Sequence, residues 1–90
     1  MLNLVIKRND NDEKFNEKKL YASVYASLMA CHTTEKEAEL ISEEVTKLIR
    51  RWVANKSHVS SHDLRLETAK HLRDYNHLAS YVYTHHRVLS

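Results

Sequence analysis

The 90-residue chain contains no glycine and no proline. Glycine adopts positive φ angles at no steric cost, and phosphate-binding loops of the G-x-x-x-x-G-K-[ST] and G-x-G-x-x-G types depend on it. Such loops are therefore excluded, and any bound phosphate must be held by side chains and by the N-termini of helices. An all-β fold is also disfavoured, because its many turns need special backbone angles. The sequence thus predicts long helices joined by short polar turns.

The charge balance and the single cysteine limit the partners and the compartment. Fourteen Lys and Arg residues against twelve Asp and Glu leave a net charge of only +2 with neutral histidines. Strong non-specific binding of nucleic acid needs clustered basic charge instead. Cys31 cannot form an internal disulfide, so we expect a cytoplasmic protein. We expect neither a signal peptide nor a membrane span, because no apolar run is long enough for either.

The first 15 residues predict a small β-hairpin, which we place at residues 3–15. Residues 4–8 alternate weakly between apolar and polar side chains, and residues 13–15 can pair back on them. Asn9 to Asp12 would form the turn, because Asn and Asp best replace glycine where φ must be positive.

Four helices follow from capping signals and from apolar periodicity. The expected N-cap residues are Asn16, Thr34, Ser60 and Asn76. The expected helices span about residues 17–32, 35–55, 61–75 and 77–88, and residues 57–60 form a short extended link. The predicted fold is a single α-rich α+β domain over residues 1–90, in which a four-helix bundle packs against the hairpin.

The apolar residues of these helices recur at helical spacing, which predicts one shared core. The expected inward positions are Leu20, Val24, Leu28, Cys31, Ala38, Ile41, Val45, Leu48, Ile49, Trp52, Val53, Leu64, Ala69, Leu72, Tyr75, Leu78, Ala79, Val82, His86 and Leu89. Ala22, Ala26 and Ala30 would let a neighbouring helix approach the first helix closely.

The N-terminal residues resemble the ATP-cone domain. The family pattern reads V-x-K-R, a polar turn, E-x-F/I and then N/D-x-x-K-I/L. The matching residues here are Val5, Lys7, Arg8, Glu13, Phe15, Asn16, Lys19 and Leu20. The later helices agree in length and order, so the likeness covers residues 4–87.

The resemblance implies a non-catalytic regulatory module that binds ATP or dATP, expected with Mg²⁺. Such modules convert the identity of the nucleotide into a change of oligomeric state, or of association with a partner such as a ribonucleotide reductase or the repressor of its operons. Lys7, Arg8 and Lys19 would hold the triphosphate through charge-assisted hydrogen bonds. An anion at the start of the first helix would also satisfy the free N–H groups there. Glu13 and Asn16 would face the base or the sugar.

Three further residues belong to this implied site, and one residue departs from the family pattern. Val5 and Ile6 would wall the adenine, and Arg65 is a further candidate for the phosphate. The family has K-R-D-G at the turn, whereas this chain has Asn9 and Asp10 after the basic pair. Asp10 brings a Cβ and a negative charge toward the phosphate. Three outcomes stay open: weaker binding, binding that needs Mg²⁺ to offset the repulsion, and loss of nucleotide binding.

The alternative is a cone without nucleotide that acts as a protein-interaction or DNA-binding module. The basic residues of the last two predicted helices are Arg65, Lys70, Arg73 and Arg87. Glu67 and Asp74 interrupt this face, so DNA binding is disfavoured. Candidate contacts for a protein partner, or for self-association, are Tyr81, Tyr83 and Val88 near the C-terminus.

Neither a metal site nor a catalytic site is predicted. His58 and His62 are four residues apart, but the expected cap at Ser60 separates them, and neither H-E-x-x-H nor C-x-x-C occurs. We also expect no serine on a strand-to-helix turn of the nucleophile type.

Overall fold

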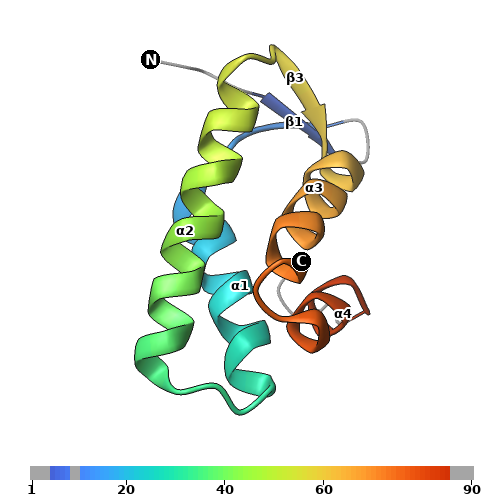
Figure 1. Cartoon of the computed structure of the whole chain (residues 1–90). Coiled ribbons are helices and arrows are strands. Elements are labelled where there is room, and N and C mark those ends of the chain that lie inside the picture. The colour runs from blue at the N-terminus through green and yellow to red at the C-terminus, as the bar shows by residue number, and fades with distance from the viewer. Residues whose placement is uncertain (1–4, 9–10, 86–90) are drawn as a thin grey trace.

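The computed structural model describes residues 5–8 and 11–85, with side chains from Lys14 to His85. Within these ranges the elements are β1 (Val5–Arg8), β2 (Asn11–Lys14), α1 (Glu17–Ala30), α2 (Glu35–Ala54), β3 (His58–Ser60), α3 (Ser61–Arg73) and α4 (His77–His85). The helix-rich character predicted from the sequence is confirmed (Figure 1). None of the helices in this part of the chain has the length and apolar character needed to cross a bilayer.

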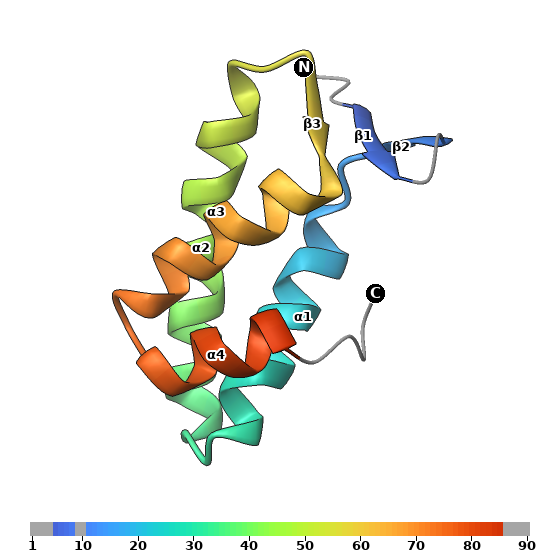
Figure 2. The ribbon, with the colours of Figure 1, turned by 90° about the vertical axis from the view of Figure 1, so that its right-hand side faces the viewer.

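The strands form a three-stranded sheet in the order β2-β1-β3, at the end of the bundle where α2 ends and α3 begins (Figures 1 and 2). β1 pairs antiparallel with β2, and Val5 lies opposite Lys14. Asn11 and Asp12 belong to β2, so the prediction that they lie in the turn is wrong. β1 also pairs with β3 in parallel. Residues 58–60, expected only as part of an extended link, are therefore a strand.

All four predicted N-caps are confirmed. The backbone N–H of Lys19 donates to the side-chain oxygen of Asn16 at 3.1 Å, and that of Glu37 donates to Thr34 at 3.1 Å. Ser60 accepts from Asp63 at 2.9 Å, and Asn76 accepts from Ala79 at 2.9 Å. Side chains that compete with the backbone in a helix interior thus stand at the positions where they fix its start.

The core lies between the helices and includes β3. Its buried members are Leu20, Val24, Leu28, Ala38, Ile41, Val45, Ile49, Val53, Val59, Leu72 and Ala79. Phe15, Cys31, Trp52 and Leu64 pack against this cluster while partly exposed. The radius of gyration of 12.5 Å is close to the value of about 12 Å expected for a compact chain of this length.

Some predicted inward positions are wrong, and two lie outside the described residues. Leu78 is 59% exposed and Tyr75 is 47% exposed. α3 ends at Arg73, so Tyr75 lies in the turn before α4, and a hydrogen bond of 2.8 Å from the Ser80 hydroxyl to the Ala69 carbonyl turns a different face of α4 inward. His86 and Leu89 lie outside the described residues.

The alanines of α1 do not mediate a close helix contact. Ala22, Ala26 and Ala30 are all exposed, so that expectation is wrong. α1 instead buries Leu20, Val24, Ser27 and Leu28. The small residue on its buried face is therefore Ser27, whose hydroxyl donates to the Ser23 carbonyl at 3.0 Å.

Candidate functional site

The sheet connects two helix N-termini to the strand that carries the basic pair. β2 leads into α1 and β3 leads into α3, and both strands flank β1. Lys7 of β1 lies opposite Ser60, which is the N-cap residue of α3. The end of β1 that carries Lys7 and Arg8 is therefore adjacent to the start of α3, where free backbone N–H groups and the helix dipole favour an anion.

α1 begins at the other end of the same strand. Val5 pairs with Lys14, the last residue of β2, and α1 starts at Glu17. The two helix starts thus lie near opposite ends of β1, whose residues advance about 3.3 Å each. A ligand that contacts both helix starts must therefore be extended, as a nucleotide triphosphate is, rather than a single phosphate.

Asn16 and Lys19 occupy the start of α1. The side-chain oxygen of Asn16 accepts the Lys19 N–H, so that oxygen is used by the cap. Lys19 is exposed and follows Glu17 by two residues, about 200° around the helix. Glu17 points toward α2, where it binds Arg50, and Lys19 therefore points away from α2.

Arg65 lies on the inward face of α3. Thr68 and Leu72 follow it by three and seven residues, so the three side chains share one face of the helix, and both Thr68 and Leu72 are 0% exposed. Arg65 itself is half-buried. None of the ion pairs among residues 14–85 includes Arg65. An inward guanidinium without a carboxylate partner is a favourable position for an anionic ligand.

Tyr83 brings α4 to the same place. Burial raises the pKa of its hydroxyl above the usual value, while a hydrogen bond with Thr68 and the positive charge of Arg65 act in the opposite direction. Arg65, Thr68 and Tyr83 therefore form a cluster between α3 and α4, which we call the Arg65 cluster. Tyr83 also packs against the core while partly exposed, and its role as a partner contact stays a prediction.

The other predicted partner contacts have different outcomes. Tyr81 is 60% exposed, and its ring stacks on His85 with 4.0 Å between the ring centroids. Val88 and Arg87 lie outside the described residues. On α3, the Oε2 atom of Glu67 lies 3.9 Å from Nζ of Lys70 and 3.2 Å from Nε2 of His71. A carboxylate therefore offsets the basic charge of this face.

The predicted residues on the strands are placed only by their backbone. Val5, Lys7 and Arg8 lie in β1, and Glu13 lies in β2 opposite Ile6. The side chains of these residues, and the whole of Asp10, lie outside the described part of the structure. Their roles toward a nucleotide stay predictions, as do those of Asn16, Lys19 and Arg65.

Sequence reasoning missed one contact that holds the start of α1. Arg50 of α2 donates to both carboxylate oxygens of Glu17, at 2.8 Å each. This bidentate pair lowers the pKa of Glu17 below its usual value. No local pattern predicts it, because the two residues are 33 positions apart. Tyr83, in contrast, could have been found, since Ala79, Val82 and Tyr83 follow helical spacing.

No metal centre is evident among the described residues: from Lys14 to His85, no group of three or more His, Cys, Asp or Glu side chains could hold a metal ion. Basic residues and helix N-termini lie at this end of the bundle together with acidic side chains, among them Glu17 and Asp63 in the first turns of α1 and α3.

Comparison with known proteins identifies the family. The model of the ATP cone domain matches residues 3–87, nearly the whole chain. Neither the search of curated proteins nor the search of solved structures finds a match. The matched range includes the three strands, the four helices, the basic pair and the Arg65 cluster. The chain therefore belongs to the ATP-cone domain family.

Proposed function

We propose that this chain binds ATP or dATP, with Mg²⁺, at the end of the bundle formed by the sheet and by the starts of α1 and α3. ATP-cone domains are regulatory, nucleotide-binding and non-catalytic modules. The observation that carries the proposal for this chain is the inward, half-buried Arg65, which has no carboxylate partner among residues 14–85. A bound polyanion would supply that partner.

The strand register supports a particular arrangement of the ligand. Lys7 and Arg8 are adjacent to the start of α3, so the phosphates would lie there, between the basic pair and Arg65. The base and sugar would extend toward Val5, Glu13 and the start of α1. Because the start of α1 lies at the base and sugar end, Lys19 would reach the phosphates only with its side chain extended along the ligand, on the side away from the Glu17–Arg50 pair.

Nucleotide binding would act by changing association with a second copy or with another protein. A ligand shifts an equilibrium between two states only as far as it prefers one of them, and a shift from 1:99 to 99:1 needs about 5.5 kcal/mol of preference. The nucleotide would therefore have to contact elements that differ between the two states. The candidate elements are α3 and α4, which meet at the Arg65 cluster.

The experiment is size-exclusion chromatography with light scattering, in ATP, in dATP and without nucleotide, each with Mg²⁺ or with EDTA. We expect the mass distribution at saturation to depend on which nucleotide is present, and the effect to weaken in EDTA. Identical masses under all conditions would contradict the regulatory part of the proposal. A direct binding titration then separates that result from an absence of binding.

A further inference from the structure

α2 carries its charges in two separate halves. The helix spans Glu35–Ala54, about 30 Å at 1.5 Å per residue. The acidic residues of its first half are Glu35, Glu37, Glu39, Glu43 and Glu44, and Lys36 is the one basic residue among them. The second half carries Lys47, Arg50 and Arg51 and no acidic residue. Such a helix is electrostatically complementary to a reversed copy of itself.

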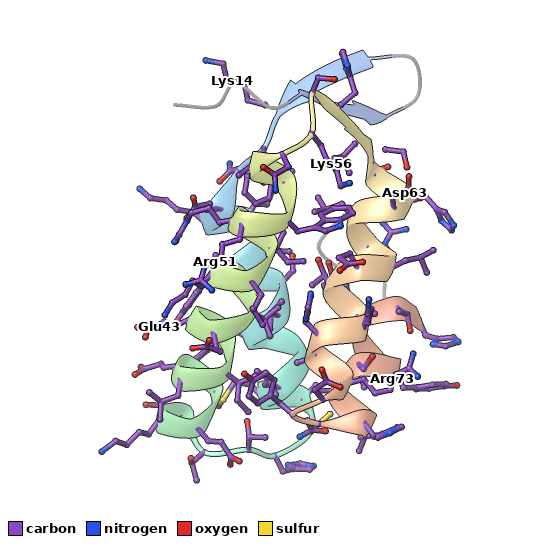
Figure 3. The ribbon with its side chains drawn as sticks, turned by 45° about the horizontal axis from the view of Figure 1, so that its top comes forward. Lys14, Glu43, Arg51, Lys56, Asp63 and Arg73 are labelled. Carbon is purple, nitrogen blue, oxygen red and sulfur yellow. The ribbon has the colours of Figure 1, made fainter. Side chains whose placement is uncertain are left out.

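Part of this charge lies on one outward stripe. Leu40, Glu43, Lys47 and Arg51 follow one another at three- or four-residue spacing, so they share a face, with Glu39 beside it. The four charged residues are exposed, and Leu40 is 60% exposed. Figure 3 shows Glu43 and Arg51 projecting outward from the flank of α2 that faces away from α3.

Among residues 14–85, the charged side chains of the stripe form no ion pair. The ion pairs among residues 14–85 join Arg50 to Glu17, and Lys70 and His71 to Glu67. Glu39, Glu43, Lys47 and Arg51 take part in none of them. Their charges are therefore available to a partner.

α1 extends this face with aromatic surface. Tyr21 and Tyr25 stack with their ring centroids 6.2 Å apart, and both are half-buried. Glu39 and Glu43 lie close enough to Tyr21 to raise the pKa of its hydroxyl, together with the larger effect of burial. A groove of about 430 Å³ runs between the two helices, with Lys18 and Tyr21 on one side and Glu43 and Lys47 among the residues of the other.

We propose that this face docks the same face of a second copy of the chain, with the two α2 helices antiparallel about a two-fold axis at the level of Val45. In a two-fold interface every contact occurs twice. Glu43 of each copy then faces Lys47 of the other, and Glu39 faces Arg51. Leu40 lies over the apolar stem of Arg50 of the other copy, and the paired tyrosines of α1 flank the contact.

Charge complementarity favours a second copy of the chain as the partner that covers this face of α2. A parallel arrangement would place acidic half on acidic half, whereas the antiparallel arrangement pairs all four exposed charges of each copy. Exposed ion pairs attract weakly and are screened by salt, with a Debye length of about 8 Å at physiological ionic strength. The dimer is therefore weak and salt-sensitive. It uses the outward stripe of α2 rather than the sheet or the start of α3, and this inference does not rest on the proposed function.

The test is sedimentation equilibrium of the whole chain and of charge-reversed variants, in low and high salt. Glu43→Lys or Lys47→Glu alone places like charges opposite each other, and we expect each to raise the dimer dissociation constant about tenfold or more. An equimolar mixture of the two variants restores opposite charges at both contacts and should form a heterodimer. The double variant E43K/K47E should also regain the homodimer.

Matched controls use the same charge changes away from the stripe. Asp74→Lys and Arg73→Glu lie at the end of α3, where both residues are exposed, and both should leave the dimer unchanged; circular dichroism checks that every variant folds. A chain that is monomeric at millimolar concentration in low salt overturns the proposal. So does a dimer that neither single reversal weakens, or that the mixture fails to restore, since another surface or another partner is then responsible. Nucleotide titration of Glu43→Lys reports separately on the proposed function.

Discussion

Arg65 lies on the inward face of α3, where its neighbours on the same stripe are fully buried. Placing a guanidinium beside such residues costs desolvation free energy, which a facing carboxylate normally offsets. No such carboxylate is present among residues 14–85. If Arg65 served the fold alone, an apolar side chain at this position would stabilise the folded chain at least as well. A substitution of Arg65 therefore distinguishes a structural role from a role in binding.

We predict that Arg65→Met weakens ATP binding about ten- to a hundredfold, as expected for the loss of one charge-assisted contact of about 1.5–3 kcal/mol. The free energy of unfolding should stay unchanged or rise, because methionine keeps the apolar stem and removes the desolvated charge. Calorimetric titration and urea unfolding measure the two effects. Arg73→Met, on an exposed position of the same helix, is the control. A variant that binds ATP normally but unfolds more easily would assign Arg65 to the fold.

Tyr83 gives a prediction about high pH. Its pKa is raised chiefly by burial, above the usual value of 10.0, so the folded chain holds the proton at a pH where the unfolded chain has released it. The stabilisation is fully present below about pH 10 and is lost as the pH rises through the raised pKa. Urea unfolding from pH 8 to 11 should show a smaller loss of stability in Tyr83→Phe than in the unmodified chain. Tyr75→Phe, at an exposed ring, should lose as much as the unmodified chain, and an equal loss in Tyr83→Phe would refute the prediction.

At the level of elements, the end of α1 shows how the chain manages without glycine. Thr33 donates its N–H to the Leu28 carbonyl at 3.4 Å and His32 donates to Met29 at 3.1 Å, which is a Schellman motif. The position between helix and turn that glycine usually occupies is taken by His32, whose φ is 65°. Histidine tolerates this left-handed conformation better than most residues, but a Cβ still adds strain there.

We predict that His32→Gly stabilises the chain by about 0.5–1 kcal/mol, since relief of the left-handed strain exceeds the added entropy of the unfolded chain. Thermal and urea unfolding measure the change. His62→Gly, in the first turn of α3, is the matched control and should destabilise by up to about 1 kcal/mol. If both variants destabilised to the same extent, the helix end would not be strained.

The contact between Glu17 and Arg50 joins the start of α1 to the second half of α2. Its side chains are 41% and 54% exposed, so solvent screening limits the coupling to about 1 kcal/mol or less. We predict a coupling of this size at pH 7 from a double-mutant cycle with Glu17→Gln and Arg50→Gln. The pKa of Glu17 is lowered from 4.5, chiefly by its hydrogen bonds with Arg50. The contribution is therefore present above about pH 4.5 and is lost as the pH falls through the lowered pKa. A coupling that persists undiminished in strong acid would contradict this origin.

At the scale of the whole molecule, local sequence signals predicted the helices. Contacts between residues far apart in the sequence determine β3 and the orientation of α4. The caps at Asn16, Thr34, Ser60 and Asn76 are local hydrogen bonds, so the sequence alone locates the helix starts. β3 escaped prediction because its partner β1 lies some 50 residues earlier, and three residues carry no periodic pattern of their own. The rotation of α4 was missed for a similar reason, since the Ser80–Ala69 hydrogen bond fixes it from another helix.

The candidate site was predictable in part. Family resemblance supplied Lys7, Arg8 and Arg65, but composition and periodicity give no reason to place them together. Only the sheet order shows that the basic pair ends beside the start of α3 rather than that of α1. The structure thus adds the direction in which a nucleotide would lie.

The most direct test of the central claim is a calorimetric titration of the chain with ATP and with dATP in the presence of Mg²⁺, repeated with Lys7→Ala and with Lys14→Ala. Lys14 is an exposed lysine on the neighbouring strand β2 and serves as the control. We predict saturable binding near micromolar affinity, about −8 kcal/mol, that Lys7→Ala weakens about tenfold or more and Lys14→Ala leaves unchanged. Absence of binding at millimolar nucleotide, or equal binding by the unmodified chain and Lys7→Ala, would contradict the account.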